Sequence, residues 1–217
     1  MLPERKRSKL LVSAVFLACF TILLFVNYRY NSTIDQVPFS DQYVKLLQRI
    51  FFDDRFQTFV DLGSSNFASM RLMNVPREKT YTGVDTVEES VRVNKRKYNS
   101  HRYSNYFFYH LVELMELKFQ FKGDLLIVNK DFLNRFSNSE IQYFIDNVLS
   151  NFKYALITSQ QPTEDVSQLN SDLISDDKEK FRPIDLTFPP FDLKNTDIVL
   201  QHYSSKTIVF LYTNPNL

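Results

Sequence analysis

The chain has 217 residues, which is enough for one domain of ordinary size and little more. Its 44% hydrophobic and 24% charged residues are typical of a folded protein, and a net charge of +1 gives no overall attraction to nucleic acid. One cysteine excludes an internal disulfide, and three glycines exclude collagen-like and glycine-rich architectures. Because glycine is so scarce, we expect each of the three to lie where a side chain is not tolerated.

An uncharged apolar segment near the N-terminus predicts a membrane anchor. Residues Leu10–Val26 form a run of 17 without a charge. At about 1.5 Å per residue, a helix of this length spans roughly 26 Å, which suits a thin bilayer. Basic residues gather before the run, at Arg5, Lys6, Arg7 and Lys9. By the positive-inside rule, the sequence predicts a type II single-pass protein of the endoplasmic reticulum or Golgi. Its parts would be a cytosolic tail (1–9), a transmembrane signal anchor (10–26) in the lipid bilayer, a stem (27–38) and a lumenal domain (39–217).

A cleaved signal peptide is the alternative interpretation of the same segment. The apolar region of such a peptide normally ends at small residues, whereas this run ends in Val26-Asn27-Tyr28-Arg29. The uncleaved anchor is therefore favoured. A glycosylation sequon, Asn31-Ser32-Thr33, lies too close to the predicted membrane edge to indicate topology strongly.

After the stem, helical and strand-like patterns alternate. Apolar residues at helical spacing predict a helix over Asp41–Phe52, and short β-prone runs predict strands over Thr58–Gly63 and Tyr81–Asp85. A helix is expected between these strands, over Ser64–Met73. The Thr86-x-x-Glu89 capping box predicts another helix, which ends at Tyr98.

The second half of the domain continues this alternation. Tyr106–Leu114 is aromatic and β-prone, and the apolar run Gly123–Asn129 has the pattern of a strand buried on both faces. Ser137-x-x-Glu140 is a capping box that precedes an amphipathic helix. A fifth strand is expected over 154–159, and two β-rich runs at 198–202 and 206–213 predict a hairpin.

This order of elements predicts an α/β fold. We expect a Rossmann-like sandwich with a mostly parallel sheet and a C-terminal antiparallel hairpin, preceded by one transmembrane helix. The three glycines fall at the points that a nucleoside site uses: Gly63 follows the first strand, Gly83 lies in the second and Gly123 opens the fourth. Asp85, at the end of the second strand, is well placed to accept hydrogen bonds from ribose hydroxyls.

These segments resemble the class I S-adenosylmethionine-dependent methyltransferases. The first motif is carried by FVDLGSSNFAS (59–69), the second by YTGVDTVEESVRVNKRKY (81–98), and the fourth, with the helix and strand that follow it, by GDLLIVNKDFLNRFSNSEIQYFIDNVLSNFKYALITS (123–159). FRPIDLTFPPFDL (181–193) resembles the segment before the terminal hairpin in some members. The resemblance covers about residues 41–213 and implies S-adenosylmethionine as cofactor.

The resemblance also implies a set of cofactor-binding residues. Asp61 and Gly63 would line the methionine end, Asp85 would bind the ribose, and Glu113 would lie near the adenine. Asn129, followed by Lys130 and Asp131, would lie where cofactor and acceptor meet. Ser65 stands where the family has its second glycine, so the first motif is degenerate.

The residues themselves leave alternatives open. Asp61 and Asp85 could instead cap the helices that follow them, and Lys130 and Asp131 could be solvent-exposed loop residues. Lys95-Arg96-Lys97 is interpreted as a solvated helix face, so no nucleic acid partner is expected. No metal is expected either, since no His, Cys or Asp set has metal-ligand spacing. No catalytic residue is singled out, because methyl transfer mainly requires that the acceptor be aligned with the cofactor.

Three functions follow from these observations. The first is a membrane-anchored methyltransferase with an unknown acceptor. The second is a catalytically inactive methyltransferase-like protein kept as a binding or scaffolding module, which Ser65 favours. The third is a lumenal glycosyltransferase, which the anchor layout suggests, although the sequence contains no Asp-x-Asp motif.

Overall fold

The structure is a computed structural model of the chain, and it describes residues 41–65, 75–98, 105–117, 121–160, 169–173, 182–202 and 207–217. The predicted tail, signal anchor at 10–26 and stem lie outside the described residues, as does the predicted helix at 64–73 beyond Ser65. Among the helices of the described residues, none is long and apolar enough to cross a membrane. The chain from Phe39 to Leu217 forms one compact unit.

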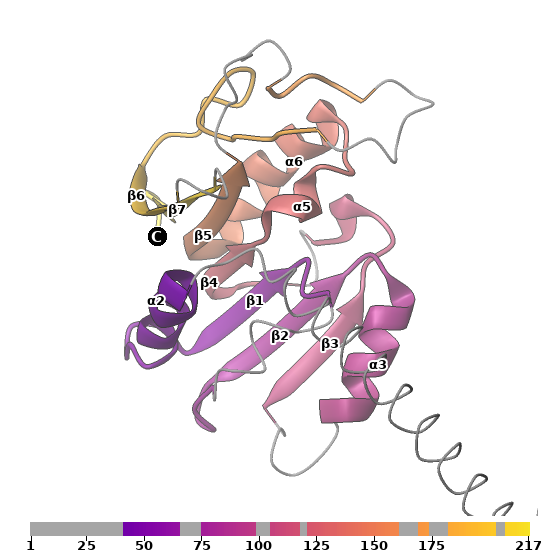
Figure 1. Cartoon of the computed structure of the whole chain (residues 1–217), viewed down its shortest axis with the longest axis vertical. Coiled ribbons are helices and arrows are strands. Elements are labelled where there is room, and N and C mark those ends of the chain that lie inside the picture. The colour runs from indigo at the N-terminus through magenta and orange to yellow at the C-terminus, as the bar shows by residue number, and fades with distance from the viewer. Residues whose placement is uncertain are drawn as a thin grey trace, which may run out of the picture. The chain divides into compact units, whose positions relative to one another are not determined.

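Seven strands form one mixed sheet in the order β3-β2-β1-β4-β5-β7-β6 (Figure 1). Neighbouring strands from β3 to β5 are parallel, and β7 pairs antiparallel with both β5 and β6. The predicted mostly parallel sheet and its C-terminal hairpin are therefore confirmed. The strands are β1 (Thr58–Leu62), β2 (Thr80–Asp85), β3 (Tyr106–His110), β4 (Gly123–Val128), β5 (Phe152–Gln160), β6 (Thr196–His202) and β7 (Thr207–Thr213).

Short helices connect and cover these strands. They are α2 (Asp41–Phe51), α3 (Glu88–Tyr98), α5 (Lys130–Leu133) and α6 (Asn138–Asn147), with 3-10 turns η3 (Leu114–Glu116) and η4 (Leu149–Asn151). The predicted capping box at the start of α6 is present: Ser137 accepts from the amide of Glu140, and the Glu140 carboxylate accepts from the amide of Ser137. The start of this helix is thus fixed by residues three apart in the sequence.

Two local predictions were wrong. The third strand was expected to run to Leu114 but ends at His110, because the chain then turns so that Leu111 and Leu114 enter the core. Ahead of α3, Asp85 accepts from the amide of Val87 at 2.8 Å, while the carboxylate of Glu89 pairs with Arg92. The predicted Thr86 capping box is therefore replaced by contacts of Asp85.

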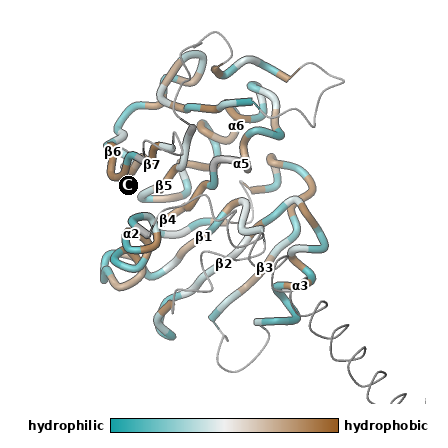
Figure 2. The backbone as a smooth tube through the Cα atoms, viewed as in Figure 1, coloured by the Kyte–Doolittle hydropathy of each residue, from teal (hydrophilic) through white to brown (hydrophobic). Residues whose placement is uncertain are grey.

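The sheet separates two hydrophobic cores. On one face, α2 and α3 pack over aromatic residues that include Phe51, Phe59 and Tyr81. On the other, α6 packs with Ile141 and Phe144 against alternate residues of the same strands. Figure 2 shows α3 mostly in teal, as expected for a helix that buries only one narrow face. The result is three layers, and β4 is buried on both faces from Leu125 to Val128, as predicted.

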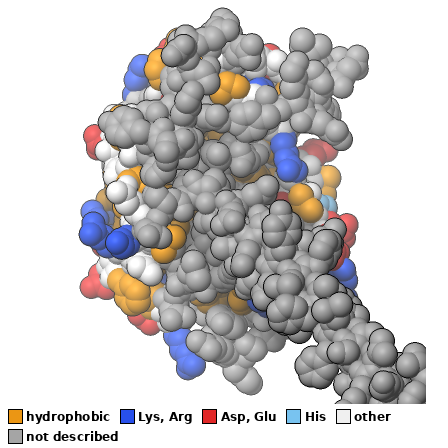
Figure 3. Space-filling model, in the orientation of Figure 1, with side chains coloured by type: hydrophobic (Ala, Val, Ile, Leu, Met, Phe, Trp, Pro, Cys, Tyr) orange, Lys and Arg blue, Asp and Glu red, His pale blue; other side chains and the backbone are white. Residues whose placement is uncertain are grey.

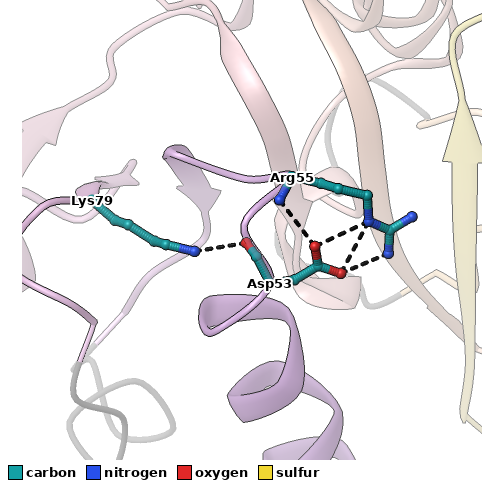
Figure 4. A network of polar contacts seen from close by, with 3 residues as sticks. All are labelled: Asp53, Arg55 and Lys79. Carbon is teal, nitrogen blue, oxygen red and sulfur yellow. Dashed lines mark hydrogen bonds and ion pairs between the residues drawn. The ribbon is translucent and has the colours of Figure 1, made fainter.

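Polar contacts close the edge of the sheet where the parallel strands begin. Lys79 is buried and donates from Nζ to the carbonyl of Asp53 at 2.6 Å, while the Asp53 carboxylate pairs with Arg55 (Figure 4). Nearby, Oδ2 of Asp124 accepts from the amides of Gln57 and Thr58 at 2.7 and 3.0 Å. These contacts hold the starts of β1, β2 and β4 together at the edge opposite the predicted site.

Residues 169–173 and 182–193, which lie between β5 and β6, include polar side chains that are buried and hydrogen-bonded. Arg182 donates to Oδ1 of Asn138 at 2.7 Å and to the carbonyl of Phe136. Asn170 donates to the carbonyl of Asp185 at 2.8 Å. The side chain of Asp185 is fully buried, and burial raises its pKa. The chain before the hairpin is therefore fixed against α6.

Close packing of neighbouring side chains explains two of the three glycines. A Cβ on Gly83 would lie 2.8 Å from the Phe108 ring, and one on Gly123 would lie 2.7 Å from Oγ1 of Thr58. Both distances are shorter than ordinary van der Waals contact, so a side chain at either position would displace its neighbour. The expectation that these positions do not tolerate a side chain is confirmed.

Candidate functional site

The carboxyl ends of the parallel strands bring most of the predicted site residues to one edge of the sheet. Asp61 lies in β1, Gly63 and Ser65 form the turn after it, Asp85 ends β2, and Asn129 follows β4 directly. Side-chain contacts join these residues into two groups: Asp61, Gly63 and Asn129 in one, and Ser65 with Asp85 in the other. The strand order reverses between β1 and β4, which is where ligands bind in open α/β sheets.

Asp61 is buried beneath the turn. Its Oδ2 accepts from the hydroxyl of Tyr81 at 2.5 Å, and its Oδ1 accepts from Nδ2 of Asn129 at 2.8 Å. Burial raises the pKa of Asp61 to about 7, although both hydrogen bonds act to lower it. The acid is thus held inside the fold by side chains of β2 and of the residue after β4.

Asn129 also fixes the turn itself. Its Nδ2 donates to the carbonyls of Leu62 and Gly63, each at 3.1 Å, and its own amide donates to Leu62 at 3.1 Å. Asn129 is half-buried. One side chain therefore links the end of β4 to the turn after β1 and to the buried acid below it.

The turn after β1 has an unusual backbone. The φ angle of Gly63 is 77°, and that of Ser65 is 45°. The amides of Gly63 and Ser64 both donate to the carbonyl of Val84, at 2.9 and 3.2 Å. A Cβ on Gly63 would lie 3.0 Å from Cβ of Phe132. The turn thus needs glycine at 63 and holds a serine at 65 in the left-handed region that glycine favours.

Both carboxylate oxygens of Asp85 accept from backbone amides. Oδ2 accepts from Ser65 at 2.6 Å, and Oδ1 accepts from Val87 at 2.8 Å. Asp85 is 6% exposed. A carboxylate offers about four acceptor positions, so two are left for hydroxyl donors. Asp85 therefore holds the start of α3, which is one of the two roles that the sequence left open, and its role toward the ribose stays a prediction.

Asn94 is part of this arrangement, and sequence reasoning missed it. It lies in α3, is 1% exposed, and donates from Nδ2 to the carbonyl of Ser65 at 2.8 Å. The available signal was its spacing, because Val91, Asn94 and Tyr98 form the buried face of α3. A polar residue on such a face requires a partner.

A second contact crosses the rim of the site. The guanidinium of Arg135, from the turn after α5, lies 3.4 Å from the hydroxyl of Thr86, which follows β2. Nε2 of His110, at the end of β3, lies 3.2 Å from the carbonyl of Thr86. Both side chains are exposed. Side chains from the end of β3 and from the turn after α5 thus meet at Thr86, the residue after β2.

Glu113 stands apart from the rest of the predicted set. It is exposed and precedes η3, so it lies three residues beyond the end of β3. It makes no side-chain cap at this turn. The side chains of Lys130 and Asp131 lie outside the described residues, so their predicted roles stay predictions.

The residues at this edge fit a nucleoside cofactor. Asp85 keeps acceptor positions, and Gly63 leaves the turn without a side chain. The hydroxyl of Ser64 is buried without a hydrogen-bond partner among the described residues. Within the same residues, no group of three or more His, Cys, Asp and Glu side chains lies close enough to hold a metal ion. On the described part of the face in Figure 3, acidic, basic and hydrophobic side chains are interspersed.

Solved structures share this architecture, whereas no family model and no curated protein matches the sequence. An S-adenosylmethionine-dependent methyltransferase from Clostridium acetobutylicum ATCC 824 superimposes with a TM-score of 0.59 at 12% identity, over 90% of this chain and 98% of that one. The N-methyltransferase NodS from Bradyrhizobium japonicum WM9 gives 0.57 at 12%, over 83% and 99%. The N-terminal domain of EvdMO1 was solved in the presence of SAH (S-adenosylhomocysteine) and D-fucose. It superimposes with a TM-score of 0.58 at 11% identity, over 82% of this chain and 83% of that one.

The chain has the class I methyltransferase fold. The predicted resemblance is thereby confirmed at the level of architecture, and the degenerate first motif coincides with the turn at Ser65. At identities of 11 to 12%, the solved structures show the methyltransferase fold and do not indicate a particular acceptor.

Proposed function

We propose that the chain is an S-adenosylmethionine-dependent methyltransferase anchored to a membrane, with an acceptor still to be identified. One observation carries the proposal. Within the methyltransferase fold, two contact groups lie at the carboxyl edge of the sheet: Asn129 contacts Asp61 and Gly63, and Asp85 contacts Ser65. The solved neighbours with bound SAH support the same cofactor class.

Each residue has a role in this proposal. Asp85 would accept the ribose hydroxyls, and the turn at Gly63 and Ser65 would face the methionine end. Asn129 and Asp61 would keep that turn in place, and Glu113 would lie near the adenine. The cofactor supplies an already activated methyl group. The protein then needs only to bind and align an acceptor, so a catalytic acid or base is not required.

Calorimetric titration of the full-length protein in mild detergent tests the proposal. We expect S-adenosylmethionine and its demethylated product to bind, and we expect Asp85→Ala to weaken binding by about tenfold or more, as loss of a charged acceptor does. Asp197→Ala is the matched control, because Asp197 is an exposed acid on β6, remote from the strand switch. A folded protein that binds neither compound would contradict the proposal.

A non-catalytic module is the second candidate. Ser65 has a positive φ where the family has glycine, and both oxygens of Asp85 already accept from backbone amides. Both features favour a site that has lost turnover. Radiolabelled S-adenosylmethionine, incubated with the protein and a membrane lysate, separates the two: binding without any labelled product supports the module, and labelled product supports the enzyme.

Membrane anchoring is part of the proposal and rests on Leu10–Val26 with its basic flank. It predicts a type II protein whose 39–217 domain lies in the lumen of the endoplasmic reticulum or Golgi. Protease treatment of sealed microsomes tests this. The domain should survive until detergent is added, and digestion in intact vesicles would refute the topology.

A further inference from the structure

We propose that Asn94 is a positioning residue for the cofactor site. Its hydrogen bond holds Ser65 at a positive φ angle, which a glycine at that position would adopt without such support. This inference rests on the proposed cofactor-binding function. Asn94 lies within the second motif segment (81–98), at a position to which the resemblance assigns no role, and it decides whether Asp85 is correctly presented.

Ser65 is held from both sides. Its amide donates to Oδ2 of Asp85 at 2.6 Å, and its carbonyl accepts from Nδ2 of Asn94 at 2.8 Å. Its φ angle is 45°, a region in which a Cβ is unfavourable. A serine keeps this conformation only if its surroundings impose it. The two hydrogen bonds, one from β2 and one from α3, do so.

The composition of α3 supports a dedicated role for Asn94. The buried face of this helix consists of Val91, Asn94 and Tyr98, so an apolar residue at 94 would complete the packing without needing a partner. Burying an amide is costly unless it is hydrogen-bonded. Asn94 is 1% exposed, and its amide is aimed at the turn after β1. Its contact with Ser65 is what justifies a polar side chain there.

The contact has a consequence for Asp85. While Ser65 is left-handed, its amide points at the carboxylate and fixes the orientation of Oδ2. If Asn94 is lost, Ser65 relaxes toward negative φ, its amide turns away, and the carboxylate loses one of its two fixed donors. The acceptor positions meant for the ribose are then no longer preorganised, so the affinity for the cofactor falls.

A double-mutant cycle in the full-length protein tests this inference. Asn94→Leu should weaken SAH binding by about tenfold, which corresponds to about 1.4 kcal/mol. Ser65→Gly alone should change the affinity by less than about threefold. In the double variant Asn94→Leu/Ser65→Gly, the SAH affinity should return to within about threefold of that of Ser65→Gly alone. The reason is that glycine adopts a positive φ angle without a supporting hydrogen bond.

Asn105→Leu is the matched control. Nδ2 of Asn105 donates to the carbonyls of Pro76 and Lys79 at 3.0 and 2.8 Å, near the start of β2 and away from the site. Its loss should lower the unfolding midpoint and leave the SAH affinity unchanged. A merely structural Asn94 would behave in the same way. If Asn94→Leu does not fold, Asn94→Ala removes the donor without adding volume and should show the same rescue by Ser65→Gly.

The outcomes separate this inference from the proposed function. If Asn94→Leu binds SAH like the unchanged protein, or if Ser65→Gly fails to rescue it, the positioning role is refuted. If the unchanged protein binds no SAH, the proposed function fails. The role of Asn94 is then tested by the unfolding midpoints of Asn94→Leu with and without Ser65→Gly. If Asn94→Leu destabilises the protein clearly less in the Ser65→Gly background, the positioning role of Asn94 is supported. Equal destabilisation in both backgrounds overturns it.

Discussion

The hydroxyl of Tyr81 donates to Oδ2 of Asp61 over 2.5 Å, and both residues are buried to 1% exposure or less. They lie on neighbouring parallel strands and point to the same face of the sheet. This places an ionisable acid directly below the turn that would carry the cofactor. Because burial raises its pKa to about 7, the acid changes its charge near neutral pH.

We predict that stability falls as the pH rises toward neutral. The pKa of Asp61 in the folded protein, about 7, is above its usual value of 3.8. The folded state therefore binds more protons than the unfolded state between these values, and unfolding becomes easier as the pH increases. From about pH 5 to about pH 8 the loss from this group is on the order of 2 kcal/mol. Denaturant unfolding across this range measures it.

Asp61→Asn is the matching variant, and it should remove most of this slope. Asp185 contributes in the same direction, because burial raises its pKa too. Adding Asp185→Asn should therefore change the remaining pH dependence in the same direction as Asp61→Asn does. A slope unchanged by Asp61→Asn would show that Asp61 is ionised throughout the range.

Asn129→Ala should destabilise the protein more at high pH than at low pH. The variant removes the donor to Oδ1 of Asp61 and the two contacts to the turn carbonyls. Since an ionised carboxylate needs its donors more than a neutral one, we expect a loss of about 1 kcal/mol near pH 5 and about 3 kcal/mol near pH 8. Unfolding curves at both pH values measure the difference, and an equal loss at both would contradict this prediction.

Gly63→Ala should lower both stability and SAH affinity. The φ angle of Gly63 is 77°, and a Cβ there would meet Phe132 at 3.0 Å. A non-glycine residue in the left-handed region costs about 1 to 3 kcal/mol. Thermal unfolding and calorimetry check the two effects. Retention of full stability would show that the turn has another accessible conformation.

Asp124→Ala should destabilise the fold by about 2 kcal/mol without affecting the cofactor site, because charged acceptors are worth this much when partly buried. Its carboxylate accepts from Gln57 and Thr58 at the start of β1. Asp54→Ala is the control, since Asp54 is an exposed acid of the same edge. Unfolding midpoints of the two variants should differ clearly, while their SAH affinities should agree.

The fold could be predicted largely because its signals are local. The capping box of Ser137 and Glu140 connects residues three apart, and the continuous apolar run of β4 indicates a buried strand directly from the sequence. The end of β3 was predicted wrongly because Leu111 and Leu114 continue the apolar character of the strand. Only the packing of the turn after β3 distinguishes them from strand residues.

The site could be predicted as a set of residues but not as a set of contacts. Asp61 and Asp85 were found from their places at strand ends, since parallel strands end at one edge. The contacts of Asn129 with Asp61 and of Asn94 with Ser65 span 68 and 29 residues. Such partners depend on the register of the sheet and on the rotation of α3, which no short sequence pattern encodes.

The direction of β7 has a practical consequence. Because this last strand runs antiparallel to β5, Asn214 returns to the start of β5, where its amide donates to the carbonyl of Lys153 at 3.0 Å. At about 3.3 Å per residue, the length of β5 separates this end from the cofactor edge by roughly 30 Å. Leu217 is exposed. A purification tag, a fluorophore or a surface tether fused after Leu217 therefore leaves the carboxyl edge open to ligands, and binding measured on such a fusion reports on the unobstructed site.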